Sequence, residues 1–405
     1  MEVISVKKKT ALFMGVLLIA ALWTGCGRSN IPADPEAHTA TPLPTETPVE
    51  TPTPEPTPEP IVPEEVAPES DLPAGKMYSY LTGEVVDEAY GKQRPFAVMI
   101  NNLSPAVPQS SLPYADLLYE AYVEGSITRL MAVYQDVSQI QKIGPIRSSR
   151  HYYLDFSDDN DAIYTHFGWS AVAEQRIHNE GRTTINGMDF DGSMGFFRTS
   201  DRYAPHNAYA TGEGLRGLAQ GFGLRMTYEE GYEPNLVFNK EDKEPEEGEG
   251  ATVIQFPYPV NNPWFEYNAE DRQYYRFEYG SPHVDMETGE QLKFKNVVVQ
   301  YVEQSSYNGD PILLELYLTG AGTGLYFTDG KMQRIYWEKN SLGVPTKYYD
   351  DKGAPLALNP GKTMFQIAPP EMAITWSGNV DTVDTEVEHL EVVGDPAFGE
   401  DTQEG

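Results

Sequence analysis

The sequence predicts an N-terminal domain of mixed α/β layers and a mostly β C-terminal domain, both following a disordered stalk rich in Pro, Thr and Glu. Between residues 95 and 220, apolar runs of strand length alternate with segments of helical character. After residue 250, the apolar runs are short, rich in β-branched and aromatic residues, and separated by turn residues. Before residue 76, closely spaced prolines exclude both helix and sheet.

Turn and cap residues position the elements of the N-terminal domain. Pro145 prevents an earlier start of the first helix, which Ser148 or Ser149 would cap, and Thr211 would cap the third helix. The segment 117–124 reads as a half-buried element that could be a helix or a strand. The predicted strands are 95–102, 129–135 and 162–167, and the predicted helices are 150–156, 171–179 and 213–220.

Changes of composition predict the domain boundaries. The run KEDKEPEEGEG divides the two folded regions, and the end of the chain is acidic without lysine or arginine. The expected units are a signal peptide (1–25), the stalk (26–75), the N-terminal domain (76–239), an acidic linker (240–250), the C-terminal domain (251–376) and an acidic disordered tail (377–405). The strands expected in the C-terminal domain are 252–256, 274–279, 296–302, 312–318 and 333–337.

The first 26 residues have the pattern of an exported lipoprotein. Three lysines at 7–9 precede an apolar run at 10–23, which is shorter than the roughly 20 residues of a spanning helix. The run ends in LWTGC, which resembles a bacterial lipobox, with Trp23 where such boxes usually carry leucine. We therefore expect cleavage before Cys26 and acylation of this cysteine, for example with palmitate. The lipid would anchor the protein on the extracytoplasmic face of the cell membrane.

Charge and cysteine content narrow the classes of partner and chemistry. The formal net charge of -32 argues against binding to nucleic acid or to an anionic lipid surface, because both need a basic face. A small anionic ligand in a local basic pocket remains compatible with this charge. Cys26 is the single cysteine, so the folded part has no disulfide, thiol nucleophile or cysteine metal ligand. We predict no cofactor and no metal site.

Several sequence blocks match one protein family in order. They are RPFAVMINN, ADLLYEAYVEG, KIGPIRSSRHYYLDF, DAIYTHFG, APHN, FKNVVVQY and NPGKTMFQI, and they extend from Arg94 to Ile367. These blocks resemble the YerB-like bacterial lipoproteins, which carry an N-terminal and a C-terminal domain of unknown function. The resemblance implies a membrane-anchored extracytoplasmic lipoprotein with a mixed α/β layered fold. It implies no reaction and assigns no catalytic residue.

The segment 142–169 gathers arginines, hydroxyls, a histidine and aromatics, and it is the first candidate binding site. Arg147 and Arg150 lie three residues apart at the predicted helix start. Together with the Ser148 and Ser149 hydroxyls and the free backbone N–H groups there, they could hold a carboxylate or phosphate. The alternative is that each arginine pairs with an internal carboxylate, which the excess of acidic residues favours.

Three carboxylates form a second candidate group. Asp116, Glu120 and Glu124 are spaced by four residues and share one face of a helix or a strand. On a helix, neighbouring carboxylates would lie about 6 Å apart, within range of acid/base pairing, whereas on a strand they would lie roughly 13 Å apart. The alternatives are a solvated acidic face or, if a glutamate meets Arg147 or Arg150, a structural ion network.

Two histidines complete the candidate site. His166 ends a predicted strand, and His206 follows Pro205 in the loop that also holds Arg202 and Asn207. Either histidine could serve as a general base, but no HExxH or His-x-His spacing indicates a metal site. The alternative is that each histidine is simply held by hydrogen bonds.

These features lead to three hypotheses on function. We favour an extracytoplasmic membrane lipoprotein that binds a ligand, such as a cell-wall fragment, or a protein partner of the envelope through the arginine and histidine residues. The second hypothesis is a cell-wall hydrolase, with Glu120 or Glu124 and His166 or His206 as acid and base. The third is a structural factor in envelope assembly.

Overall fold

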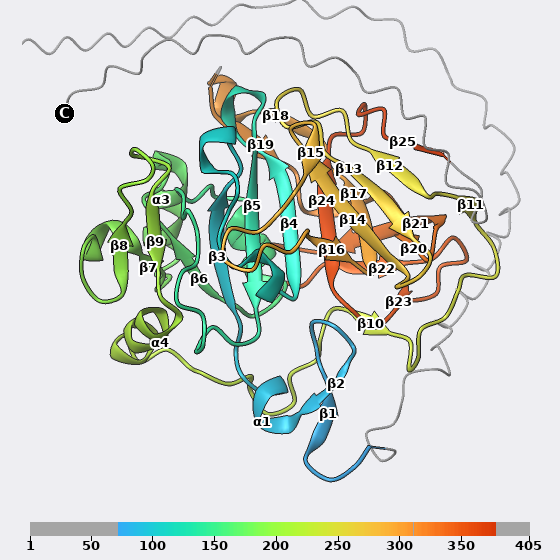
Figure 1. The fold of residues 1–405 in the computed structure, drawn as a ribbon, viewed down its shortest axis with the longest axis horizontal. Coiled ribbons are helices and arrows are strands. Elements are labelled where there is room, and N and C mark those ends of the chain that lie inside the picture. Colours follow the sequence, from blue (N-terminus) through green and yellow to red (C-terminus); the bar gives the residue numbers. More distant parts are fainter. Residues whose placement is uncertain (1–71, 311, 378–405) are drawn as a thin grey trace, which may run out of the picture. The chain divides into compact units, whose positions relative to one another are not determined.

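The computed structural model describes residues 72–310 and 312–377. The predicted signal peptide, Cys26, nearly all of the predicted stalk and the predicted tail after residue 377 lie outside the described residues. Within these residues, many short strands form several sheets, and helices are few (Figure 1). The prediction of a mixed fold with a mostly β C-terminal half is confirmed.

An eleven-stranded sheet forms the centre of the structure (Figure 1). Its strands are β3 (Phe96–Asn101), β4 (Leu117–Tyr122), β5 (Thr128–Tyr134), β6 (Ile163–His166), β7 (Ile185–Asn186), β11 (Glu249–Gly250), β17 (Asn296–Tyr301), β20 (Gly320–Thr328), β21 (Lys331–Lys339), β22 (Lys347–Tyr349) and β24 (Thr363–Ala368). The spatial order is β11-β21-β20-β17-β24-β4-β5-β3-β6-β7, with β22 paired to β21. Strand β24 pairs in parallel with β4, so this sheet runs across the predicted linker.

The remaining strands form a second sheet and four small pairs. The second sheet contains β12 (Val253–Gln255), β13 (Trp264–Asn268), β14 (Gln273–Glu278), β15 (Ser281–Pro282), β16 (Lys293–Phe294) and β25 (Thr375–Ser377). The pairs are β1 (Lys76–Tyr78) with β2 (Val85–Asp87), β8 (Phe196–Arg198) with β9 (Ala208–Ala210), β10 (Val237–Phe238) with β23 (Ala357–Leu358), and β18 (Gln304–Ser306) with β19 (Leu314–Leu316).

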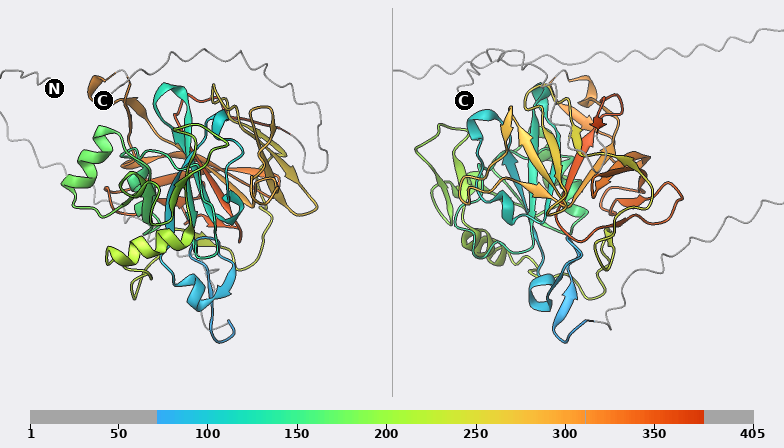
Figure 2. Two further views of the ribbon diagram at one scale, coloured as in Figure 1. Left: turned by 60° about the vertical axis from the view of Figure 1, so that its left-hand side comes forward. Right: turned by 45° about the vertical axis from the view of Figure 1, so that its right-hand side comes forward.

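Both faces of the long sheet are buried at β3, which explains why this strand is apolar from Phe96 to Ile100. Val98 and Ile100 point to one face and Ala97 and Met99 to the other. The first face packs against the second sheet and a helix, and the second face packs against two further helices (Figure 2). The α-helices of residues 72–310 and 312–377 are α1 (Glu88–Gly91), α2 (Tyr153–Asp158), α3 (Ala171–Asn179) and α4 (Gly212–Gly221).

Two helices agree with the prediction, and a third begins later than predicted. Helix α3 has the predicted bounds, and the Thr211 hydroxyl accepts from Gly214 N–H at the start of α4. Helix α2 begins at Tyr153 rather than at residue 150, and its N-cap is Tyr152 without a side-chain cap. The prediction that Ser148 or Ser149 caps this helix is therefore wrong. Backbone bonds of this segment to the sheet, including Arg147 N–H to the Met99 carbonyl, replace the helical ones.

The first turn of α4 gives a steric prediction. A Cβ added at Gly212 would overlap the backbone carbonyl of Val137, with the carbonyl carbon 2.5 Å away. We expect Gly212→Ala to lower the free energy of unfolding by about 3 kcal/mol, since only a backbone shift can relieve this contact. Gly217→Ala, in the same helix, is the control, because its Cβ would meet nothing within 4 Å. It should raise stability by about 0.5–1 kcal/mol in urea unfolding. Equal effects of the two variants would contradict the prediction.

Candidate functional site

One edge of the long sheet collects the predicted cationic residues. Strands β3, β4 and β6 run in the same direction, so their carboxyl ends meet at this edge. Such edges commonly hold the binding side chains of α/β proteins. Arg129, near the start of the antiparallel β5, lies opposite Asn101 at the end of β3. We call Arg129, Arg147 and Arg150 the arginine cluster, because Arg129 donates to the backbone carbonyl of Ser148, the residue that follows Arg147.

Two members of the cluster have protein partners. The Arg150 guanidinium forms an ion pair with Glu124 at 2.6 Å and donates to the Ser149 carbonyl at 2.9 Å. Arg129 is 4% exposed and donates to the Ser148 carbonyl at 2.5 Å. Burial, followed by the two neighbouring arginines, lowers the pKa of Arg129 to about 9. The predicted pairing of Arg150 with an internal carboxylate is thus observed.

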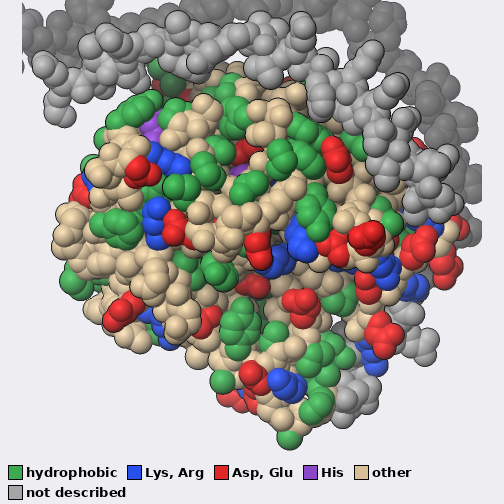
Figure 3. Space-filling model, in the orientation of Figure 1, with side chains coloured by type: hydrophobic (Ala, Val, Ile, Leu, Met, Phe, Trp, Pro, Cys, Tyr) green, Lys and Arg blue, Asp and Glu red, His purple; other side chains and the backbone are tan. Residues whose placement is uncertain are grey.

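Arg147 differs from its neighbours. Across the described residues 72–310 and 312–377, its side chain has no hydrogen-bond or ion-pair partner, and its Nε is buried. Burial, followed by the charge of Arg150, lowers the pKa of Arg147 to about 10. Three arginines and the single carboxylate of Glu124 leave a formal excess of two positive charges. This excess lies in a protein whose net charge is -32, and Figure 3 shows acidic side chains spread over the visible face.

His206 joins the arginine cluster from a separate loop. It is 7% exposed, and its Nδ1 lies 2.8 Å from the Asn101 side-chain nitrogen. Burial, with smaller effects from the positive charges of Arg147 and Arg202, lowers the pKa of His206 to about 4. The imidazole is therefore neutral at physiological pH. The loop that carries His206 lies beside the Arg147 segment, because the Ile146 backbone N–H donates to the Ala208 carbonyl at 2.7 Å, and Asn101 contacts the imidazole.

The other residues of this loop serve to hold its shape. Arg202 donates to the backbone carbonyls of Ala106 and Pro108, the latter at 2.6 Å. The Asn207 amide donates to the Thr199 carbonyl at 3.0 Å and accepts from Arg198 at 3.0 Å. These bonds fix the loop that presents His206.

His166 is enclosed rather than exposed at this edge. Its Nδ1 lies 2.7 Å from the Gly168 carbonyl and its Nε2 lies 2.9 Å from the Thr184 hydroxyl, and the side chain has no exposed surface. Burial lowers the pKa of His166 to about 4. The Ser148 hydroxyl donates to the Phe167 carbonyl at 3.2 Å, while that of Ser149 accepts from Tyr164 at 3.0 Å. The side chains of His166, Ser148 and Ser149 thus form hydrogen bonds within the protein.

The predicted acidic group separates into three environments, because its element is the strand β4. Asp116 is 9% exposed, and burial raises the pKa of its carboxyl to about 6, although the Gln135 backbone N–H donates to it. Glu124 pairs with Arg150, while Glu120 is fully buried. The alternative of a solvated acidic face is therefore wrong, and the carboxylates are too far apart for acid/base pairing.

Glu120 belongs to a buried polar network that the sequence patterns did not indicate. The Arg276 guanidinium lies 2.7 Å from Glu120 Oε2 and 3.0 Å from Glu278 Oε2, and all three side chains are at most 1% exposed. Gln366 and Asn261 also donate to Glu120, at 2.9 and 2.8 Å. The network is completed by Asn102, Gln109, Thr128 and His283. In the sequence, the feature that points to this network is Arg276, a charged residue among the aromatic residues of β14.

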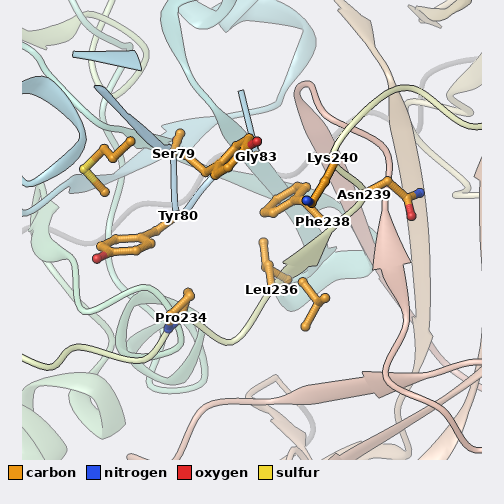
Figure 4. Close-up of a pocket in the computed structure, with 11 residues that line it drawn as sticks. Ser79, Tyr80, Gly83, Pro234, Leu236, Phe238, Asn239 and Lys240 are labelled. Atoms are coloured by element: carbon orange, nitrogen blue, oxygen red, sulfur yellow. The ribbon is translucent and has the colours of Figure 1, made fainter. Parts of the chain in front are cut away.

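Two cavities among the described residues have no member of the arginine cluster in their lining. One cavity of about 390 Å³ is lined by apolar and aromatic side chains, with Tyr80 and Phe238 on opposite sides of it (Figure 4). A second, polar cavity of about 630 Å³ lies beside Asp350 and Arg334. No helix in the described ranges is long and apolar enough to cross a membrane. The same part of the chain contains no group of three or more His, Cys, Asp or Glu placed to hold a metal ion.

Comparison with known proteins identifies the family. A protein of Bacillus subtilis (strain 168) named "Putative lipoprotein YerB" is 32% identical over 302 residues, which are 73% of this chain and 87% of that protein. The crystal structure of YerB from Bacillus subtilis matches with a TM-score of 0.66 at 30% identity, covering 74% of this chain and all of that chain. Residues 81–225 and 254–365 match the N-terminal and C-terminal domains of DUF3048, described as a protein of unknown function. This chain belongs to the DUF3048 family.

The two DUF3048 domains contribute differently to the polar features. The arginine cluster, Asn101 and His206 all lie in the N-terminal DUF3048 domain. The buried network joins Glu120 of that domain to Arg276 of the C-terminal domain. The network therefore holds the two DUF3048 domains together, whereas the arginine cluster is the candidate ligand site.

Proposed function

We propose that this protein is a lipoprotein, anchored through Cys26 on the extracytoplasmic face of the membrane, that binds an anionic ligand of the cell envelope at the arginine cluster. One observation carries the proposal: Arg147 is half-buried, with its Nε fully buried, near two further guanidiniums and without an acidic partner in the described ranges. A buried charge is costly unless it is paired. A bound oxyanion would supply the missing charge and hydrogen-bond acceptors.

The geometry favours binding over the alternative of a wall hydrolase. A general acid or base must reach the substrate. Glu120 and His166 are fully buried, and Glu124 already pairs with Arg150. Of the two histidines, only His206 lies near the arginine cluster, and its neighbours are cations and an amide rather than a carboxylate. This environment suits a hydrogen-bond donor to an anion.

The anchor is tested on the membrane fraction of the cell that makes the protein. We expect mass spectrometry to find a mature chain beginning at an acylated Cys26, because the cysteine directly follows the apolar run. Cys26→Ser should abolish the acyl mass. A full-length chain with an unmodified Cys26 would overturn the anchor.

The site is tested by titrating the full chain, in detergent, with pyrophosphate. We expect Arg147→Gln to weaken binding by about tenfold or more, since one charge-assisted hydrogen bond contributes about 1.5–3 kcal/mol. The same variant should unfold at a higher urea concentration without ligand, because it removes a partly buried charge that has no acidic partner among the described residues. Arg334→Gln, on the exposed surface of β21, is the control and should change neither quantity. Destabilisation by Arg147→Gln together with unchanged binding would make Arg147 structural and refute the site.

A further inference from the structure

Asn101 determines which nitrogen of His206 carries the proton. The Leu103 backbone N–H donates to the Asn101 side-chain oxygen at 3.1 Å, so the amide NH₂ faces His206 Nδ1 at 2.8 Å. An amide NH₂ can only donate, and Nδ1 must therefore accept. In a neutral imidazole the proton then resides on Nε2. His206 thus presents a fixed N–H donor from Nε2.

Burial, followed by the positive charges around it, keeps His206 neutral. The positive charges of Arg147, on the neighbouring segment, and of Arg202, on the same loop, both act on the imidazole. From β3 it meets Asn101, and the ring of Tyr203 packs edge-on at 5.3 Å. The nearest acid along its loop, Asp201, lies 3.8 Å from Arg202. No carboxylate among these groups faces the imidazole to stabilise an imidazolium ion.

The charge of the site indicates the class of anion. The arginine cluster with Glu124 has a formal excess of two positive charges, and His206 adds a neutral donor. A carboxylate supplies one negative charge, whereas a phosphate monoester carries about 1.5 to 2 at pH 7. We infer that the site binds a phosphate monoester, with the phosphoryl oxygens between the Arg147 guanidinium and the Nε2–H of His206. This inference rests on the proposed function and specifies its ligand.

Exposed apolar side chains near the site fit an organic group on the phosphate. Tyr203, which contacts His206, is 67% exposed, and Met188 is 60% exposed. The Met188 sulfur approaches the position of a Cβ on Gly168 to 2.8 Å, and the Ser148 hydroxyl approaches it to 3.3 Å. Met188 therefore lies beside the residue that follows Arg147. An ester group, from a soluble molecule or a lipid headgroup, would contact these side chains.

The decisive measurement compares phenyl phosphate with benzoate on the full chain in detergent. Affinity for phenyl phosphate should rise by up to about tenfold between pH 5 and 7.5, because its second ionisation lies near pH 6 while His206 stays neutral. Benzoate should bind more weakly, with little change over this range. An affinity for phenyl phosphate that falls with rising pH would show a cationic histidine and overturn the inference.

Asn101→Asp tests the positioning of the proton. A carboxylate at this place would accept a proton from Nδ1 and leave Nε2 without one, so phenyl phosphate binding at pH 7.5 should weaken about tenfold. Binding should partly recover at pH 5, where the imidazole becomes a donor at both nitrogens. Nitrogen chemical shifts of His206 in the free protein report the tautomer without any ligand. A proton on Nδ1 in the unaltered protein would overturn the inference even if anions bind.

Two outcomes separate the inference from the proposed function. If Arg147→Gln changes binding of neither pyrophosphate nor phenyl phosphate, the site itself is refuted. If binding depends on Arg147 but benzoate binds as tightly as phenyl phosphate, only the ligand class is wrong. Tighter binding of dihexanoyl phosphatidic acid than of glycerol 3-phosphate would support the inference and identify the phosphate monoester as a lipid headgroup. Equal affinities for the two compounds would support the inference and identify the phosphate monoester as a soluble molecule.

Discussion

Replacing Arg276 by methionine is expected to lower the free energy of unfolding by about 3–5 kcal/mol. Arg276 is fully buried between Glu120, at 2.7 Å, and Glu278, at 3.0 Å. Its removal would leave two carboxylates close together in the interior without a compensating charge. Urea unfolding at pH 7, followed by circular dichroism, measures the loss.

Two further variants check the cause. Arg334→Met removes an exposed arginine from β21 and should change stability by less than about 0.5 kcal/mol. Adding Glu120→Gln to Arg276→Met should restore part of the stability, because one of the two unpaired charges is gone. If the double variant is less stable than Arg276→Met alone, charge repulsion is not the cause of the loss.

The protein is expected to lose stability as the pH falls from about 6.5 to 4. A histidine in the unfolded chain has a pKa near 6.5, whereas burial lowers the pKa of folded His166 to about 4. Between these values the unfolded state binds a proton that the folded state does not, so stability is complete above pH 6.5 and falls toward pH 4. For His166 the full loss is about 3 kcal/mol. The pKa values of His206 and of buried His283 are also lowered, so both act in the same direction.

Two buried carboxyl groups, Asp116 and Asp159, oppose this trend, because burial raises the pKa of both. Burial raises the pKa of Asp116 to about 6, so its contribution is present at low pH and is lost as the pH rises from about 4 to 6. The three histidines outweigh these two carboxyls, and the net slope should remain. Urea unfolding of His166→Asn, which cannot bind a proton, should show a smaller loss between pH 6.5 and 4. A stability that is constant over this range would contradict the burial of these imidazoles.

The sequence predicts the strands that are apolar and bounded by turns. Strands β3, β5, β6 and β17 lie within a residue or two of the predicted ranges, because their apolar runs and closing turn residues are local signals. Strands β20 and β24 are not predicted, although both are central. The first half of β20 is rich in glycine, and β24 is recognisable as a strand mainly because β4 and β17 pair with it. Helix α2 begins late because sheet contacts hold the preceding residues.

The candidate site likewise contains residues that the sequence indicates and contacts that it does not. Arg147, Arg150 and His206 are indicated by residue type and by their place near strand ends. Asn101 could be placed at a strand end but not beside His206, 105 residues later. The partnership of Glu120 with Arg276 spans 156 residues. Pairings at such separations depend on strand order and register, which local patterns do not specify.

The sequence by itself determined the mixed fold with its mostly β C-terminal half, and it indicated Arg147 and Arg150 as candidate anion-binding residues. These conclusions follow from composition and local periodicity. The tertiary structure alone decided that Arg150 has an acidic partner and Arg147 has none among the described residues. It also decided that one sheet joins both DUF3048 domains. The reason is physical, because pairing and burial depend on which residues the folded chain brings together.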